Sequence, residues 1–329
     1  MSVLVISHEQ DLHATRVMEV LHRRGEKAHL IDLGQLPDHA TLALDYGDPT
    51  SPVATWRADK GEVVDLTAAT AVWWRRPTHP ELVSITDQDA YGFAHGEWHE
   101  ALNGLYQLLD SARWMNPPEL DARASRKALQ LRTASRLGWR VPDTLMTSDP
   151  VAAREFVERH GLGRTVYKIF AATYQVWRET RMFTADDLDS LDSLRLAPVI
   201  FQEYIPAVAD LRVTVVGSAM YPMAIYPQDP GGVDFRLTLG QSRTAAYDLP
   251  PEVRSRIRVL MDRLGLVYGG VDLRLTPEGE YVFLEVNPAG EFLFCEAGAG
   301  FPITEAMAGW LAGSEPHSQA SAPRGCGCG

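Results

Sequence analysis

The sequence predicts a chain of mixed α/β and α+β architecture, with a parallel-sheet domain at the N-terminus and a larger region of helices and antiparallel strands behind it. Three observations lead to this prediction. A strand, a helix and a second strand follow one another within the first 33 residues. An Asn-Pro-Pro segment interrupts the chain at residues 116–118, and two strands in the last third are joined by a short turn that contains Pro and Gly. A length of 329 residues leaves room for more than one domain.

The N-terminal elements form a strand–helix–strand unit. Val3–Ile6 is a short apolar run, Asp11–Arg24 has apolar residues at helical spacing and is followed by Gly25, and residues 28–33 form the next apolar run. Strands in this order pair in parallel across the intervening helix, which predicts a parallel sheet. Two more elements are expected before the Asn-Pro-Pro segment: a strand at Ala71–Trp74 and a helix at Glu97–Leu109.

Helices and strands also alternate beyond residue 116. The first expected helix, Arg123–Arg136, is strongly basic, and no acidic residue lies between Ala122 and Arg140. The other expected elements are helices at Pro150–His160 and Pro251–Leu264, and strands at Thr165–Phe170, Val199–Ile205, Leu211–Val216, Gly269–Leu275 and Tyr281–Val286. We therefore expect domains at residues 1–115, 116–195 and 196–313, followed by a tail at 314–329 that is disordered on its composition.

The charge and the cysteine content limit the partners of the chain. Acidic residues outnumber basic ones 43 to 31, which gives a formal charge of −12 and disfavours nonspecific binding to nucleic acid or to an anionic membrane. Two of the three cysteines lie in the last four residues, and no basic segment precedes the first apolar run. We therefore expect a cytoplasmic protein without a disulfide framework and without a nucleic-acid or membrane partner.

Two carboxylates and one amide lie on the two strands of the predicted hairpin. Asp272 is on the first strand and Glu285 on the second, and Asn287 follows Glu285 by two residues, which places both on the same face of that strand. Such hard oxygen ligands suit Mg²⁺. The alternative is a solvated polar face, but the flanking residues are apolar and an unpaired acid in a buried strand is costly.

Two lysines are candidates for binding an anion. Lys168 lies in an otherwise apolar strand, where a buried ammonium needs an anion that a nucleotide phosphate could supply. The alternative for Lys168 is an edge strand with the ammonium in water. Lys127 lies in the basic helix, and taken alone it is better explained as part of a solvated helix face.

Three further segments are ambiguous when each is taken alone. The strand Val199–Ile205 ends in polar residues, so it is either a hinge whose backbone binds an adenine edge or a simple strand end. Asp210 with Arg212, and Asp234 with Arg236, are each spaced by two residues, which is more often the mark of an ion pair within a strand than of a site.

In combination, these residues resemble the ATP-grasp superfamily, in which two α+β lobes bind ATP between them. The resemblance covers about residues 116–312 and is most specific in the segments 269–274 and 285–288. It implies that Lys127 and Lys168 hold the ATP phosphates. It also implies that Asp272, Glu285 and Asn287 hold Mg²⁺, with two ions expected. The other positions that it assigns to ATP binding are Gln202, Glu203, Tyr204, Ile205 and Asp210.

A finer resemblance extends over the whole chain up to the tail, because the segments 73–77, 234–236, 264–269 and 287–292 look like those of graspetide (microviridin-type) maturases. It implies a pre-ATP-grasp domain at residues 1–115, a homodimer and a precursor-peptide substrate with leader and core parts. Such enzymes phosphorylate an Asp or Glu side chain of the peptide and join it to a Thr or Ser hydroxyl or a Lys amine. By this resemblance Arg212, Arg236 and Lys168 are the catalytic candidates.

Three arginines are candidates for substrate binding, and two alternative functions stay open. Arg75, Arg76 and Arg274 are candidates for binding substrate carboxylates, although an ion pair at a domain interface explains Arg75 and Arg76 equally well. The first alternative function is a RimK-like or glutathione-synthetase-like carboxylate–amine ligase. The second is an ATP-binding module without catalysis, against which the intact Asp272, Glu285 and Asn287 speak.

Overall fold

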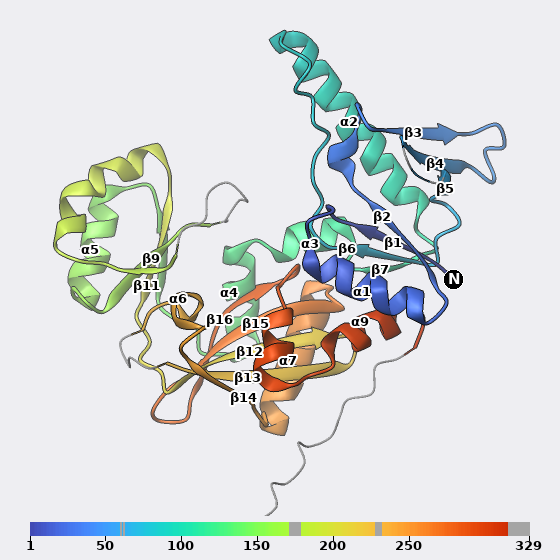
Figure 1. Ribbon diagram of the computed structural model, residues 1–329. Helices are drawn as coiled ribbons and strands as arrows, with labels where there is room; N and C mark the ends of the chain where they lie inside the picture. Colours follow the sequence, from blue (N-terminus) through green and yellow to red (C-terminus); the bar gives the residue numbers. More distant parts are fainter. Residues whose placement is uncertain (60, 62, 171–178, 228–231, 315–329) are drawn as a thin grey trace, which may run out of the picture.

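The computed structural model describes residues 1–59, 61, 63–170, 179–227 and 232–314. Figure 1 shows the described chain as an N-terminal group of elements in blue and cyan, a central group in green and yellow, and a C-terminal group in yellow, orange and red. Within these residues, no helix is both long and apolar enough to cross a membrane. The expected tail, apart from Ser314, lies outside the described residues.

The first sheet is parallel, as predicted, with the strand order β2–β1–β6–β7. The side chain of Asp11 accepts hydrogen bonds from the first backbone N–H groups of α1, and Gly25, with a φ of +79°, follows the end of that helix. The predicted strand–helix–strand unit is therefore confirmed. The bounds are β1 Ser2–Ile6, α1 Leu12–Arg23, β2 Lys27–Ile31, β6 Ala71–Trp74 and β7 Arg113–Met115.

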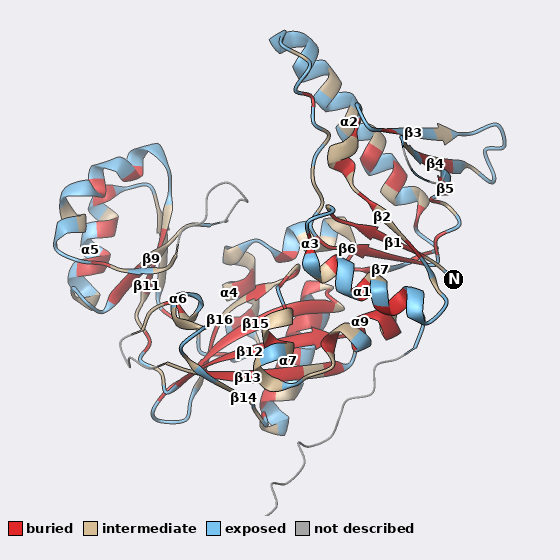
Figure 2. Cartoon of the chain, viewed as in Figure 1, coloured by how far each residue is buried: buried red, intermediate tan, exposed pale blue. Residues whose placement is uncertain are grey.

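A small antiparallel sheet and a long helix flank the first sheet. Helix α2, Gln88–Leu108, begins nine residues before the helix expected at Glu97–Leu109. Its first half is largely exposed and lacks an apolar stripe, so apolar periodicity could not indicate it (Figure 2). The remaining elements of this region are the 3₁₀ helix η1 Leu33–Gln35 and the strands β3 Ala40–Asp45, β4 Val53–Ala58 and β5 Val63–Asp65.

The predicted basic helix is wrong as a single helix. The chain forms α3, Pro118–Ala124, and α4, Lys127–Arg136, with Arg126 in an extended conformation between them. The amide of Gln130 donates hydrogen bonds to the carbonyls of Ala124 (2.6 Å) and Val286 (2.7 Å), which fixes the end of α3 and the start of α4 against the C-terminal sheet. The break brings Lys127 to the first turn of α4, facing that sheet.

The second sheet is antiparallel, with the order β10–β9–β11–β8. Helix α5 has the predicted bounds, and its Phe156 packs in a core with Phe183 and Phe201. Strand β11 pairs with β8 and β9, so it belongs to this sheet, whereas the expected domain boundary at 195/196 precedes it. The bounds are β8 Thr144–Thr147, α5 Pro150–His160, β9 Thr165–Lys168, β10 Arg181–Met182, η2 Asp186–Leu196 and β11 Val199–Glu203.

The third sheet is antiparallel, with the order β14–β13–β12–β15–β16, and it contains the predicted hairpin. Asp272 lies opposite Glu285, and Leu273 lies opposite Phe283, so Leu284 is an unpaired bulge residue that the sequence did not reveal. The strands are β12 Ala209–Val216, β13 Ala219–Tyr226, β14 Arg243–Ala246, β15 Tyr268–Leu275 and β16 Tyr281–Asn287. The helices are α6 Phe235–Thr238, α7 Pro251–Leu264, α8 Leu293–Ala299 and α9 Ile303–Leu311.

The N-terminal and C-terminal groups share one apolar core. Helix α9 packs against α1 (Figure 1), and buried residues of β1, β13 and α9 belong to the same cluster, among them Val3, Tyr221 and Met307. Burial of this core gives the loop between β16 and α8 a fixed position against the first sheet.

Candidate active site

The three candidate metal ligands meet on one face of the hairpin β15–β16. The Asn287 side-chain nitrogen donates hydrogen bonds to Oδ2 of Asp272 (3.0 Å) and to Oε1 of Glu285 (2.9 Å). Asp272 is buried, and the Glu285 side chain is 23 % exposed. The face is therefore a compact cluster of two carboxylates and an amide, and the alternative of a solvated polar face does not describe it.

Two cations contact this cluster from other elements. Lys127, in the first turn of α4, donates to Oε2 of Glu285 at 2.6 Å. Arg212, on β12, donates from Nη1 to both oxygens of Asp272 at 2.7 Å. Arg212 and Asp272 lie directly opposite each other on neighbouring strands. The expected ion pair of Asp210 with Arg212 within one strand is wrong, because cross-strand neighbours lie closer than residues i and i+2.

Lys168, the last residue of β9, is half-buried. It lies close enough to Glu285 and Asp272 for their charges to act on its ammonium. Its ammonium has no ion pair or hydrogen bond with any of the described residues. Burial is the largest influence on the pKa of Lys168 and lowers it below the ordinary value, while the charge of Glu285 opposes that effect. A partly buried cation in this state gains from an anionic ligand.

The two carboxylates of the cluster respond differently to burial. Burial alone raises the pKa of Glu285, but the charges of Lys127 and Lys168 outweigh it, and the pKa lies below the ordinary value. Burial raises the pKa of Asp272 although the Arg212 charge opposes it. The two lysines therefore hold Glu285 ionised, whereas the pKa of Asp272 stays raised although the charges of Arg212 and Lys127 oppose the effect of burial.

The expected hinge forms a small cavity of about 60 Å³ between the second and third sheets. Among the described residues, none accepts a hydrogen bond from the Ile205 backbone N–H, so this donor is available beside the cavity. The Gln202 amide donates to the Thr144 hydroxyl at 2.9 Å, and the Glu203 carboxylate accepts from Arg140 at 3.4 Å. The described residues that line the cavity are Pro142, Val166, Lys168, Thr180, Gln202, Glu203, Tyr204, Ile205, Val233, Arg274 and Leu284.

Arg274 holds this hinge in place. It pairs with Asp210 at 2.8 Å and donates to the backbone carbonyls of Ile205 (2.7 Å) and Gly232 (2.8 Å). Its guanidinium also lies 5.4 Å from the ring centre of Tyr204. Asp210 is not among the cavity residues, so it contributes to the hinge through Arg274, and the contacts of Arg274 are with the protein.

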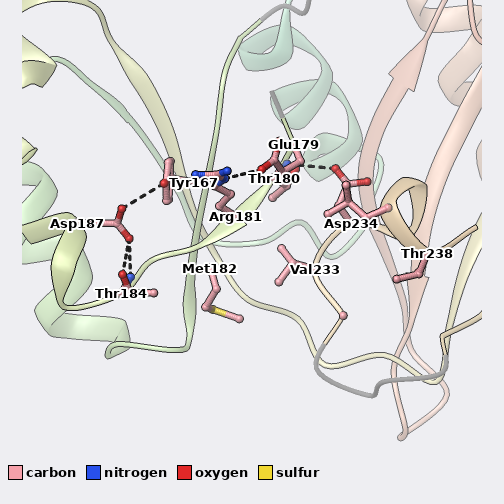
Figure 3. A pocket seen from close by; sticks show the side chains of 12 residues that line it. Tyr167, Glu179, Thr180, Arg181, Met182, Thr184, Asp187, Val233, Asp234 and Thr238 are labelled. Atoms are coloured by element: carbon pink, nitrogen blue, oxygen red, sulfur yellow. Dashed lines mark hydrogen bonds and ion pairs between the residues drawn. The ribbon is translucent and has the colours of Figure 1, made fainter. Parts of the chain in front are cut away.

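Arg236 and Asp234 do form an ion pair, at 2.5 Å, but at the start of α6 and not in a strand. Asp234 is buried and also accepts hydrogen bonds from the N–H of Thr180 (3.1 Å) and of Arg236 (3.1 Å). Figure 3 shows Asp234 at one side of a cavity of about 430 Å³, with Thr180, Arg181 and Tyr167 opposite. The Asp234 carboxylate therefore joins the second sheet region to α6 beside a cavity between the two lobes.

Arg75 and Arg76 lie in the interface between the first sheet and the C-terminal group. Arg75 has no exposed surface and donates to Asp11 at 3.0 Å and to the carbonyl of Gly290 at 3.0 Å. Arg76 pairs with Glu291 at 2.9 Å. In this structure the two arginines match the interface alternative and not the substrate-binding hypothesis.

The donor set fits a hard divalent cation. Two carboxylates and an amide converge, and rotation of the Asn287 side-chain amide by half a turn would exchange its nitrogen for its oxygen. Among the residues that the structure describes, no group of three or more His, Cys, Asp or Glu side chains is placed to hold a metal ion. A cation at this cluster would therefore need the amide oxygen and oxygens from a ligand or water to complete its shell.

Several cavity residues escaped the sequence analysis. Leu284 faces the hinge cavity because it is the bulge residue of β16, and a bulge leaves no trace in an apolar run. Pro142, Val166, Thr180 and Val233 come from separate segments and have no chemistry that marks them individually. Asn116 is not a cavity residue, but its side chain hydrogen-bonds the backbone of Tyr268 and Pro288. The sequence indicated the Asn-Pro-Pro segment that contains it only as a chain break.

Residues 2–121 match the domain family described as MvdD pre-ATP grasp domain. Among curated protein sequences, none matches the chain.

Three solved structures illustrate the similarity over the full length. The macrocyclase MdnC of Microcystis aeruginosa MRC, bound with precursor peptide MdnA, is 30% identical, with 95% of this chain and 99% of that chain covered and a TM-score of 0.83. The macrocyclase MdnB of the same organism is 31% identical, with 95% and 99% covered and a TM-score of 0.81. A RiPP-associated ATP-grasp ligase of Chryseobacterium gregarium, in complex with ADP and a leader and core peptide, is 26% identical, with 94% and 96% covered and a TM-score of 0.82.

These relatives agree with the main hypothesis and with neither alternative, because they are macrocyclases and RiPP-associated ligases. The structural similarity to MdnC extends over nearly the whole of both chains. It therefore includes both the α/β N-terminal domain and the antiparallel sheets described above. The chain belongs to the ATP-grasp ligases of the graspetide (microviridin-type) maturase family, which are ADP-forming enzymes of ribosomal peptide modification.

Proposed function

We propose that the chain is a macrocyclase that uses ATP to join side chains of a ribosomal precursor peptide. An oxygen of an Asp or Glu side chain attacks the γ-phosphorus of ATP, and ADP leaves. A Thr or Ser hydroxyl, or a Lys amine, then attacks the acyl carbonyl and loses a proton, and inorganic phosphate leaves. The products are ω-ester or ω-amide links. The observation that carries the proposal is the meeting of Asp272, Glu285 and Asn287 with Lys127 and Lys168 beside the hinge cavity.

The residues around the hairpin suit a triphosphate. Lys168 lacks an ion pair among the described residues, and Lys127 reaches the same carboxylate cluster from α4. We assign both lysines to the phosphates of ATP. The adenine is assigned to the hinge segment Gln202–Ile205, where the Ile205 N–H supplies a donor and Arg274 with Asp210 fixes the backbone.

Asp272, Glu285 and Asn287 are assigned to Mg²⁺, and two ions are expected. The ATP-grasp ligase PsnB, 26% identical with 94% of this chain and 96% of that chain covered and a TM-score of 0.75, is described with a minimal precursor, Mg and ADP. When bound, Mg²⁺ neutralises charge on the phosphate oxygens. Lys127 and Arg212 already contact the same carboxylates, so their side chains orient the two acids before a ligand arrives.

Arg212, Arg236 and Lys168 are proposed to stabilise the charge that develops on the transferred phosphoryl group and on the acyl phosphate. Arg212 is held by two hydrogen bonds to Asp272, and Arg236 by its ion pair with Asp234. Donors fixed in this way lose little entropy when the charge develops, which is the basis of electrostatic preorganisation. The 430 Å³ cavity is lined by Asp234, the partner of Arg236, and offers room for peptide side chains there.

The proposed partner is a precursor peptide with a leader and a core, and the proposed assembly is a homodimer in the cytoplasm. MdnC is described with its precursor peptide, and the Chryseobacterium ligase with a leader and core peptide. Sedimentation analysis of the full chain tests the dimer, and a monomer at micromolar concentration would contradict it.

Mass spectrometry tests the proposed reaction. The full chain is incubated with ATP, Mg²⁺ and a synthetic peptide rich in Thr and in Asp or Glu. We expect the peptide to lose one water, about 18 Da, for every link formed. Addition of an amino-acid mass to the peptide would instead support a RimK-like ligase.

A further inference from the structure

The loop that follows Asn287 is held by side chains from four other places in the fold. Asn116, behind β7, donates to the carbonyl of Pro288 at 3.3 Å. Arg75, at the end of β6, donates from Nη1 to the carbonyls of Ala289 and Gly290, the latter at 3.0 Å. The remaining two contacts are those of Tyr268, whose hydroxyl donates to the Gly290 carbonyl at 2.5 Å, and of Arg212, whose Nη2 donates to the Glu291 carbonyl at 3.3 Å.

As a result, four consecutive carbonyls, those of residues 288–291, each accept a side-chain hydrogen bond. The loop is also tightly packed. A Cβ on Gly290 would lie 3.1 Å from the Asn287 carbonyl and 3.2 Å from Nη2 of Arg212. The backbone directly after Asn287 therefore has one well-defined position.

Arg75 and Asn116 directly follow strands of the first sheet, β6 and β7, and Arg75 contacts two of the four carbonyls. Its guanidinium is fully buried and pairs with Asp11 at 3.0 Å. Asp11 is in turn held by the Ser7 hydroxyl at 2.9 Å and by the backbone N–H of His13 at 2.9 Å. The position of the loop is thus tied to β1, α1 and β6 of the N-terminal domain.

Packing alone does not account for a buried ion pair at this place. Removing two charges from water is expensive, and an apolar pair of similar volume is often as stable or more stable. An apolar side chain at position 75, however, could not donate to the carbonyls of Ala289 and Gly290. The guanidinium therefore contributes something that stability does not require, namely a defined position for the loop after Asn287.

We propose that Arg75 is a positioning residue of the metal site: through the carbonyls of Ala289 and Gly290 it holds the backbone that carries Asn287. The inference rests on the proposed assignment of Asn287 as a metal ligand. By this account the N-terminal domain contributes to metal binding without touching the metal, in the way that partners behind the ligands orient a metal site.

The test measures metal affinity directly, by electron paramagnetic resonance of Mn²⁺ titrated into the full chain with saturating ADP. We expect Arg75→Lys, which keeps the charge but loses the forked geometry, to weaken Mn²⁺ binding about tenfold. Tyr268→Phe, which removes only the hydroxyl that contacts Gly290, should weaken it about threefold. Affinity for ADP without metal should change by less than about twofold in both variants, which a general loss of structure would not allow.

Arg24→Gln is the matched control. Arg24 also joins the N-terminal domain to the C-terminal group, through the Glu305 carboxylate (2.6 Å) and carbonyl (3.2 Å), but on α9 and away from the hairpin. We expect it to bind Mn²⁺ like the unaltered chain. If Arg24→Gln weakens Mn²⁺ binding as much as Arg75→Lys does, the inference is overturned, because any loosened interface would then suffice.

Asn287→Ala separates this inference from the proposed function. If Asn287→Ala weakens Mn²⁺ binding while Arg75→Lys and Tyr268→Phe do not, the positioning role is wrong and the metal assignment stands. If Asn287→Ala itself has no effect, the metal assignment fails and the inference fails with it. Should Arg75→Lys not fold, Tyr268→Phe alone decides, since it removes a single hydroxyl that donates to the same Gly290 carbonyl.

Discussion

Two of the buried arginine–aspartate pairs among the described residues, Arg212–Asp272 and Arg75–Asp11, differ in what surrounds them. Arg212 and Asp272 lie on neighbouring strands of the C-terminal sheet, with Glu285 and Asn287 in contact. Arg75 and Asp11 lie between the first sheet and the loop after β16, where the other partners are backbone carbonyls and a hydroxyl. The first pair is part of a cluster that suits a ligand, and the second joins two parts of the fold.

The difference shows that a buried ion pair by itself does not identify an active site. What distinguishes the C-terminal pair is the excess of binding capacity next to it: a lysine without an ion pair among the described residues, a second carboxylate and a hinge cavity. Arg75, in contrast, meets protein atoms on the side of Asp11 and on the side of the loop. Variants at the two places should therefore fail in different ways.

Glu285→Gln should have the largest effect, and it should affect turnover alone. The neutral amide loses the charge that Lys127 contacts at 2.6 Å and removes an anionic oxygen from the proposed Mg²⁺ site. We expect ADP formation to fall by at least about 1,000-fold, equivalent to about 4 kcal/mol, with an unchanged circular dichroism spectrum. Near-normal ADP release by this variant would remove the distinction between the two pairs.

Arg75→Met should lower stability in addition to the metal affinity considered above. It leaves Asp11 buried without its cationic partner, which is expected to lower the free energy of unfolding by about 3 kcal/mol in urea denaturation. The double variant Asp11→Leu/Arg75→Met leaves no uncompensated charge and should recover most of that loss. A double variant that is as unstable as the single one would mean that the pair is not the source of the effect.

A smaller, pH-dependent effect is expected at Asp121, a neighbour of Asn116 and Arg75. Burial raises the pKa of Asp121 from 3.8 to about 6, so the folded state binds its proton more tightly than the unfolded state does. The cost of ionising Asp121 therefore grows as pH rises from about 4 to about 6 and is fully present above that range. Asp121→Asn should stabilise the protein by about 3 kcal/mol at pH 8 and by less than about 1 kcal/mol at pH 4.

Urea denaturation of both proteins across this pH range gives the comparison for Asp121. The unaltered chain contains other titrating groups, so the difference between the two proteins is the informative quantity. A difference that is constant with pH, or one that grows toward pH 4, would contradict the raised pKa.

Local patterns allowed much of this molecule to be predicted from its sequence. The βαβ unit and the hairpin depend on neighbouring residues and on Gly and Pro at their turns, and both are confirmed. The meeting of Asp272, Glu285 and Asn287 also follows from strand geometry, although their role in metal binding stays a prediction. Helix α2 was predicted only in its second half. Its first half is largely exposed and therefore lacks the apolar residues at helical spacing that indicate a packed helix.

Long-range pairing was beyond the sequence. Asp210 and Arg212 were paired with each other because they are near in sequence, whereas their partners lie 64 and 60 positions away, at Arg274 and Asp272. For Arg75 the sequence left substrate binding and an interface ion pair equally open, because a double arginine after a strand gives no sign of the loop 214 residues later that buries it. Only the tertiary fold decides whether such a charge meets a ligand or the protein itself.

The central claim, that ATP activates a side-chain carboxylate of the peptide, is tested most directly by oxygen transfer. A precursor peptide with ¹⁸O in its Asp and Glu side chains is converted by the full chain with ATP and Mg²⁺, and the inorganic phosphate is examined by mass spectrometry. Because the acyl phosphate loses a carboxylate oxygen to phosphate, we predict one labelled oxygen in phosphate for each link formed. Links that form while the phosphate stays unlabelled would contradict this account.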